Sequence, residues 1–227
     1  MMFPNPSDNR MILCIDTITP ESCIGLVPTK GQPHFVQIPT QHSSESLFGA
    51  LDDLFGKARI APKDVKGVVV LRGPGSFTSA RVGVSFANAF AHPLRLPIAG
   101  FTTDEWARHK TDEKDFVYLQ SMNRDEMYAI GVGRHAKALK SSIIPVAELP
   151  EGRIQWIGFL TEDHLSRLPK GYNPIQNLRS ASDGWAQAIS TIDFGKPKKA
   201  YELVEPYYAK APHITPNKRF VSISKFQ

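Results

Sequence analysis

The region between residues 68 and 91 constrains the fold most, because it reads as a strand, a tight turn and a helix in immediate succession. Residues 68–71 form an apolar run typical of a buried strand. The turn that follows is rich in glycine, and its defining residues are Gly73, Pro74, Gly75, Ser76, Thr78 and Arg81. It lacks the lysine with which a P-loop reaches the outer phosphates of a nucleotide. We therefore predict a structural loop, with Ser76 as the N-cap of the helix.

The helix after this turn carries a small residue at every fourth position. Ser79, Gly83 and Ala87 would share one face, because residues four apart lie on the same side of a helix. A second helix could approach the backbone closely there, which predicts a partner interface. Packing of this face against the chain's own sheet is the alternative. Phe86 and Phe90 lie on an adjacent face, which we assign to the sheet.

Composition limits the function classes. The chain has 227 residues, of which 41% are hydrophobic, so it can form one large domain or two small lobes. It shows no apolar run of about 18 residues and no signal peptide, which predicts a cytoplasmic protein without a membrane contact. Residues 1–10 read as a disordered leader. Cys14, Cys23 and the seven histidines lack metal-ligand spacing, so we expect no metal site and no zinc protease.

Alternating strand and helix signals indicate an α/β fold. Three strands are predicted first, at residues 11–16, 22–27 and 34–38. Helix, strand, helix and strand follow, which completes the element order of a ribonuclease-H-like lobe. The first of these helices has an apolar stripe formed by Leu47, Leu51, Leu54 and Ala58.

The element order partly repeats after residue 109. Further strands are predicted at residues 116–120, 127–132 and 154–160, and a helix at residues 174–189. Two tandem ribonuclease-H-like lobes, each a mixed sheet with helices, form the actin-like (ASKHA) architecture. The predicted units are an N-terminal lobe at residues 11–108, a divergent C-terminal lobe at 109–205, and a docked segment with a basic tail at 206–227.

Asp16 stands at the end of the first predicted strand, where two enzyme classes place functional groups. Actin-fold ATPases and sugar kinases use the first hairpin to contact phosphate and Mg²⁺, which makes Asp16, Thr17 and Thr19 a candidate vestigial nucleotide loop. The matching segment of the second lobe, residues 120–125, lacks the glycine turn that brings backbone amides to phosphate. A ribonuclease-H-like nuclease is excluded, because Arg72 stands where a second metal-binding carboxylate is needed.

The C-terminal region is strongly basic. From residue 196 onward the chain has seven basic and two acidic residues, whereas the remainder is neutral overall. Such a tail either contacts nucleic-acid phosphates or lies in solvent, and the sequence leaves both readings open.

Several short motifs together resemble the TsaB (YeaZ) family, the non-catalytic partner in bacterial threonylcarbamoyladenosine synthesis on tRNA. They are residues 12–17, His42 with Ser43, residues 73–78 with Arg81 and Gly83, and residues 96–98. The resemblance covers residues 11–108 and returns faintly at residues 205–208. The chain departs from the family at Ser79, Ser121 and Asp125, while Arg124, Glu126 and Tyr128 match it.

The resemblance implies an actin-like scaffold without catalytic residues or cofactor. Its first lobe would dimerise with a TsaD-type catalytic subunit through its two helices, a TsaE-type ATPase would join them, and tRNA would be reached through the complex. The implied interface residues are Leu47, Leu51, Leu54, Ser79, Gly83 and Ala87. Homodimerisation of the chain alone is left open. The alternative function is a small ATPase or kinase that holds Mg-ATP with Asp16 and the hydroxyls of Thr17 and Thr19.

Overall fold

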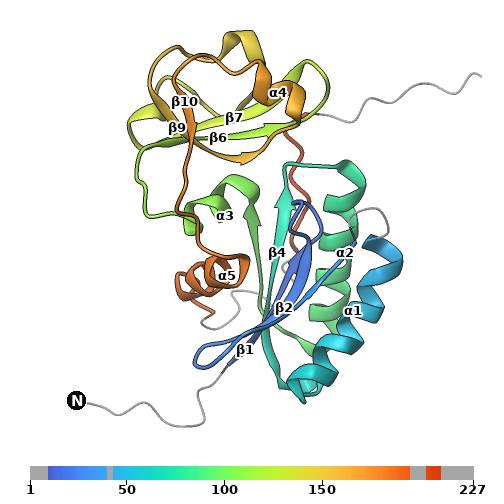
Figure 1. The fold of residues 1–227 in the computed structure, drawn as a ribbon. Coiled ribbons are helices and arrows are strands. Elements are labelled where there is room, and N and C mark those ends of the chain that lie inside the picture. Colours follow the sequence, from blue (N-terminus) through green and yellow to red (C-terminus); the bar gives the residue numbers. More distant parts are fainter. Residues whose placement is uncertain (1–9, 40–42, 195–202, 211–227) are drawn as a thin grey trace, which may run out of the picture.

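Two five-stranded sheets form two lobes in a computed structural model that describes residues 10–39, 43–194 and 203–210 (Figure 1). The first lobe contains, in chain order, β1 (Met11–Asp16), β2 (Cys23–Pro28), β3 (His34–Gln37), α1 (Ser43–Ala58), β4 (Val65–Gly73), α2 (Phe77–Leu94), β5 (Ile98–Thr102) and α3 (Thr103–His109). The second lobe contains β6 (Phe116–Ser121), β7 (Glu126–Val132), β8 (Ser142–Pro145), β9 (Ile154–Phe159), α4 (Glu162–Ser166) and β10 (Tyr172–Pro174), and helix α5 (Ala181–Ser190) follows these elements in the chain. In these described parts, no helix has the length and apolar character of a membrane span.

The two sheets have the same topology. The strand order is β3-β2-β1-β4-β5 in the first and β8-β7-β6-β9-β10 in the second. In each sheet the first strand pairs antiparallel with the second and parallel with the fourth. This arrangement confirms the predicted tandem of ribonuclease-H-like lobes in an actin-like fold.

Some elements of the second lobe differ from the sequence prediction. The helix predicted at residues 174–189 begins only at Ala181, because the Ser180 hydroxyl caps it by accepting a hydrogen bond from the Asp183 amide at 3.1 Å. Residues Tyr172–Pro174 instead form the edge strand β10. The short elements β8 and α4 were not predicted, since four or five residues carry too little periodicity to be recognised.

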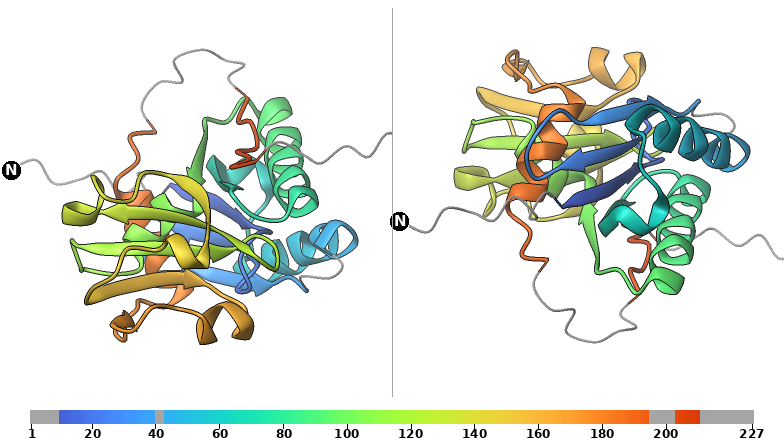
Figure 2. Two further views of the ribbon diagram at one scale, coloured as in Figure 1. Left: turned by 90° about the horizontal axis from the view of Figure 1, so that it is seen from above. Right: turned by 90° about the horizontal axis from the view of Figure 1, so that it is seen from below.

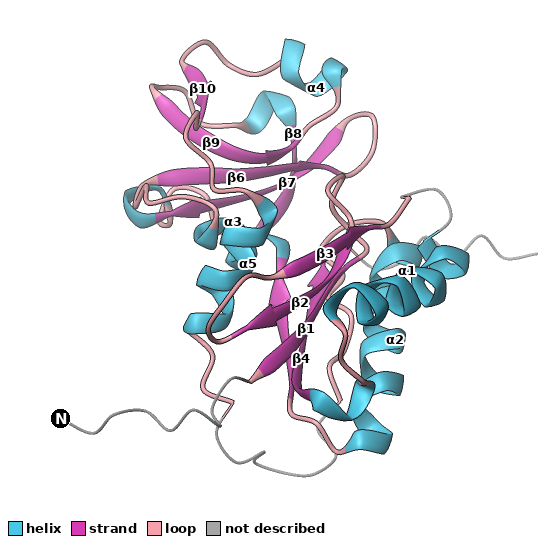
Figure 3. Ribbon diagram, turned by 60° about the horizontal axis from the view of Figure 1, so that its bottom comes forward, coloured by secondary structure: helices cyan, strands magenta, loops and turns pink. Residues whose placement is uncertain are grey.

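Side chains that alternate along β1 contribute to two hydrophobic layers, one on each face of the first sheet. Leu13 and Ile15 point to the face covered by α1 and α2, whereas Ile12 and Cys14 point to the opposite face. Figures 2 and 3 show α1 and α2 side by side on one face of this sheet, with α5 on the other. The sheet is therefore covered on both sides.

Helix α5 supplies part of that cover, although the predicted boundary at residue 109 assigned it to the second lobe. Trp185 is wholly buried against the first sheet, and its ring centroid lies 6.0 Å from that of Trp106 in α3. The structure thus places α5 on the first lobe, because its buried residues Trp185 and Ile189 pack in the hydrophobic cluster of the first sheet.

Residues 203–210 return along the first lobe and then reach the second. The Tyr207 amide donates to the Arg72 carbonyl at 2.7 Å, and the Tyr208 ring stacks on Phe77 with centroids 4.5 Å apart. Lys210 then forms a 2.7 Å salt bridge with Glu126. We call residues 203–210 the C-terminal strap. Most of the predicted leader and of the basic tail, residues 1–9 and 211–227, lies outside the described residues.

Asn88 of α2 anchors the strap, which generates a stability prediction. Its side chain donates to the Val204 carbonyl at 2.8 Å and accepts from the Val204 amide at 3.1 Å. We expect Asn88→Ala to lower the free energy of unfolding by about 1–3 kcal/mol, because two hydrogen bonds are lost and backbone groups lose their partner. Chemical denaturation measures this, with Ser85→Ala on the same helix as the control. Equal stability of the two variants would contradict the anchoring role.

Candidate functional site

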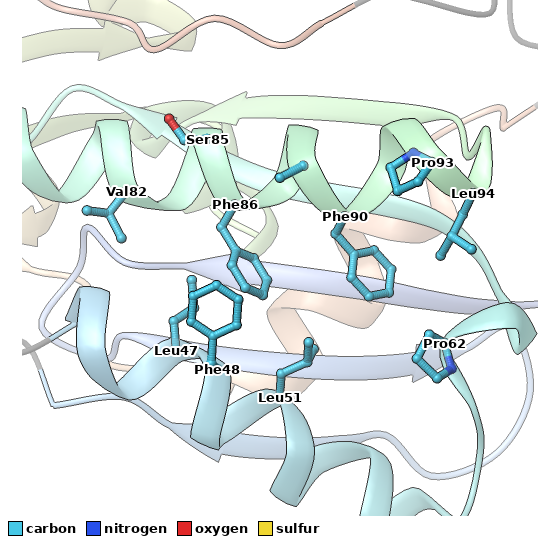
Figure 4. Close-up of a pocket in the computed structure, with 11 residues that line it drawn as sticks. Leu47, Phe48, Leu51, Pro62, Val82, Ser85, Phe86, Phe90, Pro93 and Leu94 are labelled. Atoms are coloured by element: carbon cyan, nitrogen blue, oxygen red, sulfur yellow. The ribbon is translucent and has the colours of Figure 1, made fainter.

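An open apolar groove lies between α1 and α2 and runs along both helices (Figure 4). We call it the α1/α2 groove. None of the described residues that line it has a charged side chain. They are Leu47, Phe48, Leu51, Pro62, Val82, Ser85, Phe86, Ala89, Phe90, Pro93 and Leu94. Contiguous exposed apolar surfaces mark contacts with proteins, membranes or apolar ligands, so this groove is the candidate site.

Helical spacing explains why these side chains meet. Val82, Phe86 and Phe90 recur every four residues and form one stripe of α2, and Phe48 and Leu51 face them from α1. The Phe48 and Phe86 rings meet edge to face with centroids 5.4 Å apart.

Phe48 nevertheless keeps 66% of its surface exposed, and Leu94 at the far end of the groove keeps 37%. Large aromatic side chains are costly to leave in water, since burying one stabilises by about 1.5–3 kcal/mol. A partner that covers the groove would therefore gain most from Phe48.

The predicted interface residues of α1 divide between the groove and the core. Leu51 is half-buried and lines the groove. Leu47 is buried but contributes to the groove floor. Leu54 is wholly buried against the sheet and belongs to the core, so its predicted place in a contact surface is wrong.

The small-residue face of α2 packs against the chain itself. Gly83 and Ala87 are buried, and a Cβ atom on Gly83 would collide with the Thr17 side chain. The Thr17 hydroxyl donates to the Ser79 carbonyl at 2.7 Å. The prediction that a partner helix approaches Gly83 and Ala87 is therefore wrong, and the alternative of packing within the chain holds.

The groove residues Val82, Phe86 and Phe90 were missed for a related reason. We assigned the phenylalanines to the sheet, but the sheet already faces the small residues, so the large ones point outward. One signal was available in the sequence. Helix α2 is apolar on two sides, and a single sheet can cover only one of them.

The glycine turn is packed by both lobes and by the strap. Gly73 has a φ of 123°, a conformation that favours glycine, and a Cβ there would meet the Tyr207 carbonyl. A Cβ on Gly75 would meet Ile18 and Gln120. Thr103 donates to the Pro74 carbonyl at 3.3 Å.

The remaining residues of the predicted turn lie at the N-terminal end of α2. The Ser76 hydroxyl accepts from the Ser79 amide at 3.5 Å, which is the predicted N-cap. Thr78 and Arg81 are exposed, and the Arg81 guanidinium lies 5.3 Å from the centroid of the Phe77 ring.

The candidate nucleotide loop is closed by its own hydrogen bonds. Asp16 is 1% exposed, and its Oδ1 accepts from the amides of Ile18 at 2.8 Å and Thr19 at 3.0 Å. Its Oδ2 accepts from the Thr19 hydroxyl. Burial raises the pKa of the Asp16 carboxyl, although these hydrogen bonds act in the opposite direction. With Thr17 bound to Ser79, all three residues already have partners inside the protein.

In the matching segment of the second lobe, residues 120–125, polar side chains also have hydrogen-bond partners within the protein. The Gln120 Oε1 accepts from Tyr118 at 2.8 Å and from Thr103 at 3.2 Å. The Ser121 hydroxyl lies 2.7 Å from His164 Nδ1 and accepts from the Thr161 amide at 2.9 Å. Among the residues that the structure describes, no three His, Cys, Asp or Glu side chains cluster as metal ligands do.

Comparison with known proteins points to one biosynthetic system. Residues 34–148 match the family model described as TsaD, tRNA N6-adenosine threonylcarbamoyltransferase. The chain is 32% identical over 94 residues to the tRNA threonylcarbamoyladenosine biosynthesis protein TsaB of Escherichia coli, a region that covers 40% of each protein. It is also 32% identical over 96 residues to TsaB of Bacillus subtilis, covering 41% of this chain and 42% of that protein. The aligned regions thus span about two fifths of these relatives.

Solved structures support the fold over a longer range. A Pseudomonas aeruginosa protein described as similar to peptidase YeaZ superposes with a TM-score of 0.65 at 19% identity, covering 88% of this chain and 100% of that one. YeaZ from the same organism gives a TM-score of 0.64, also at 19% identity, over 87% of this chain and 99% of that one.

The contact between Gly83 and Thr17 can be tested by adding a single methyl group. We expect Gly83→Ala to lower the free energy of unfolding by about 1–3 kcal/mol, because the methyl overpacks against Thr17. Thr17→Ala in the same chain should reduce that loss. Thermal and chemical denaturation measure both effects.

Gly49 provides the matched control. It lies in α1, and a Cβ atom there would meet nothing within 4 Å. Gly49→Ala should stabilise the protein by up to about 1 kcal/mol through helix propensity alone. If Gly83→Ala stabilises to the same degree, α2 does not pack as described.

Proposed function

The chain belongs to the TsaB (YeaZ) family, and from that membership we propose that it is the non-catalytic subunit that binds and activates a TsaD-type threonylcarbamoyltransferase for threonylcarbamoyladenosine modification of tRNA. A TsaE-type ATPase and tRNA are the further partners of the proposed complex, which would act in the cytoplasm. The single observation that carries this proposal is the α1/α2 groove.

The groove suits a homologous partner in particular. The family model that matches residues 34–148 is that of the transferase, and this range includes α1 and α2, which supports a partner with a corresponding pair of helices. Two such lobes can place their α1 and α2 pairs against each other about a pseudo-two-fold axis, as in isologous dimers. Phe48 would then enter the groove of the partner, and the partner's equivalent side chain would enter this one.

A scaffold role also agrees with the state of the nucleotide loop. A carboxylate that binds Mg²⁺ needs free oxygen lone pairs and access to solvent. Asp16 is 1% exposed, so it has no access to solvent, and three of its four lone-pair sites accept hydrogen bonds from Ile18 and Thr19. These contacts argue against the alternative of a small actin-fold ATPase or kinase.

The groove hypothesis predicts a loss of association when charge is placed in the apolar surface. We expect Phe86→Glu to weaken binding to the TsaD-type subunit by at least about 30-fold, which corresponds to a hot spot of about 2 kcal/mol. The affinity can be measured by calorimetry or surface plasmon resonance, with circular dichroism to show that the variant is folded.

Leu165→Glu serves as the control, because Leu165 is an exposed apolar residue of similar size on the second lobe. Its affinity for the subunit should equal that of the unaltered chain. Unchanged binding by Phe86→Glu would place the interface elsewhere and would remove the main support for the proposed function.

The second prediction of this proposal concerns nucleotide. Titration of the isolated chain with Mg-ATP should give no saturable heat, and no ATP hydrolysis should be detected, because the Asp16 loop is filled from within. Asp16→Ala should lower stability instead, since three donors lose their acceptor. Saturable hydrolysis that disappears in Asp16→Ala would favour the kinase or ATPase reading.

A further inference from the structure

The C-terminal strap crosses the lobe boundary on the side opposite to the two segments that connect the lobes. Residues 110–115 lead from α3 into β6, and residues 175–180 lead from β10 back to α5. Figure 1 shows both connections on the side of α3 and α5, whereas the strap, drawn in red, lies on the side of α2. The lobes are thus joined by the chain on one side and by the contacts of the strap on the other.

The two connecting segments have the character of a hinge. Neither contains a helix or a strand. Arg179 holds them side by side, because its amide donates to the Lys110 carbonyl at 2.8 Å and its guanidinium donates to the His109 carbonyl at 3.2 Å and to the Asp112 carboxylate. Hinges between domains are formed by a few such loop or element-terminal residues that absorb backbone rotation. We call residues 110–115 and 175–180 the paired connections.

The strap is anchored to the first lobe along most of its length. Val204 forms two hydrogen bonds with Asn88 of α2, and its side chain lies where a Cβ atom on Gly100 of β5 would be. The Tyr207 amide donates to the carbonyl of Arg72 in β4. Helix and sheet of the first lobe therefore hold the strap together.

The hold on the second lobe is slighter and more exposed. Ala209 packs against a buried cluster that includes Phe116 and Tyr128. Lys210 Nζ lies 2.7 Å from Glu126 Oε2, and the Lys210 side chain is 60% exposed. Exposed ion pairs are weak and are screened by salt, so the Lys210 end of the strap is the end that detaches first.

The direct contacts between the lobes are arranged around α3, which leads into the paired connections. The Thr103 hydroxyl lies 3.2 Å from Gln120 Oε1, and the Tyr128 hydroxyl donates to the Asp104 carboxylate at 3.3 Å. A rotation displaces groups beside its axis least and groups far from the axis most. These contacts can therefore persist through a small rotation about the paired connections that separates Lys210 from Glu126.

We propose that the strap is a latch, which holds the two lobes at one angle and opens at the salt bridge between Lys210 and Glu126. In the open state the strap stays on the first lobe, and the second lobe turns about the paired connections. The motion moves Gln120 away from Gly75 of the glycine turn, against which it packs in the closed state. The latch is a property of the chain alone and requires no partner subunit.

Double electron–electron resonance in the full chain tests the latch. Spin labels at Asp53→Cys on α1 and Glu148→Cys on the second lobe report the distance between the lobes, because both positions are exposed and the native cysteines are buried. Lys210→Glu sets a carboxylate against Glu126. We expect it to increase the width of the distance distribution about twofold, as a hinge motion would. Circular dichroism shows that the labelled variants are folded.

Two further variants separate the latch from local damage. Adding Glu126→Lys to Lys210→Glu restores opposite charges and should restore the narrow distribution. Arg167→Glu is the matched control, because Arg167 forms an exposed salt bridge with Asp163 at 3.0 Å that stays within the second lobe. Its distribution should equal that of the unaltered chain.

An unchanged width in Lys210→Glu would overturn the latch, as would a widening of equal size in Arg167→Glu. A widening that persists after Glu126→Lys is added would originate in the turn between β6 and β7 and would reject the proposal as well. None of these results depends on whether a TsaD-type subunit binds.

Discussion

The contact between the bare backbone at Gly83 and the side chain of Thr17 fixes how the first lobe is assembled. Because position 83 has no side chain, α2 can lie directly on the β1–β2 turn, and the Thr17 hydroxyl can reach the Ser79 carbonyl. This orientation turns the phenylalanines of α2 away from the sheet. The same contact therefore keeps the Thr17 hydroxyl bonded within the fold and turns Phe86 and Phe90 toward the α1/α2 groove, while Asp16 is held separately by Ile18 and Thr19.

The two lobes show how a shared strand topology can carry different surfaces. Both sheets have the same order and the same pattern of parallel and antiparallel pairs. Within the described residues, however, the connections that correspond to α1 and α2 are reduced in the second lobe to a 3-10 turn at Val146–Glu148 and the five-residue helix α4. That face of the second sheet is covered by loop residues, among them Leu139 and Leu149. The described helix pair with an open groove thus belongs to the first lobe.

Much of the fold could be predicted because its signals are local. The apolar runs of β1 and β4, the turn residues between them and the stripe of α1 depend on neighbouring residues, and each appears in the expected place. The position of α5 could not be predicted, since its partner Trp106 lies far away in the sequence. The interface face of α2 could not be predicted for the same reason. Which side of this helix faces inward depends on Thr17, a residue of a distant turn.

The strap has a consequence for the order in which the protein can form during translation. Asn88 and Val204 are hydrogen-bonded across 116 positions of sequence, and Trp185 of α5 covers a sheet whose first strand begins at Met11. The ribosome therefore releases the whole first sheet long before the residues that complete its two faces. Until residue 207 emerges, the Arg72 carbonyl has no strap amide to bind and one apolar layer stays open. The N-terminal lobe is thus completed only after residue 207 has emerged, and until then a nascent chain carries an incompletely covered sheet that is exposed to chaperones or to aggregation.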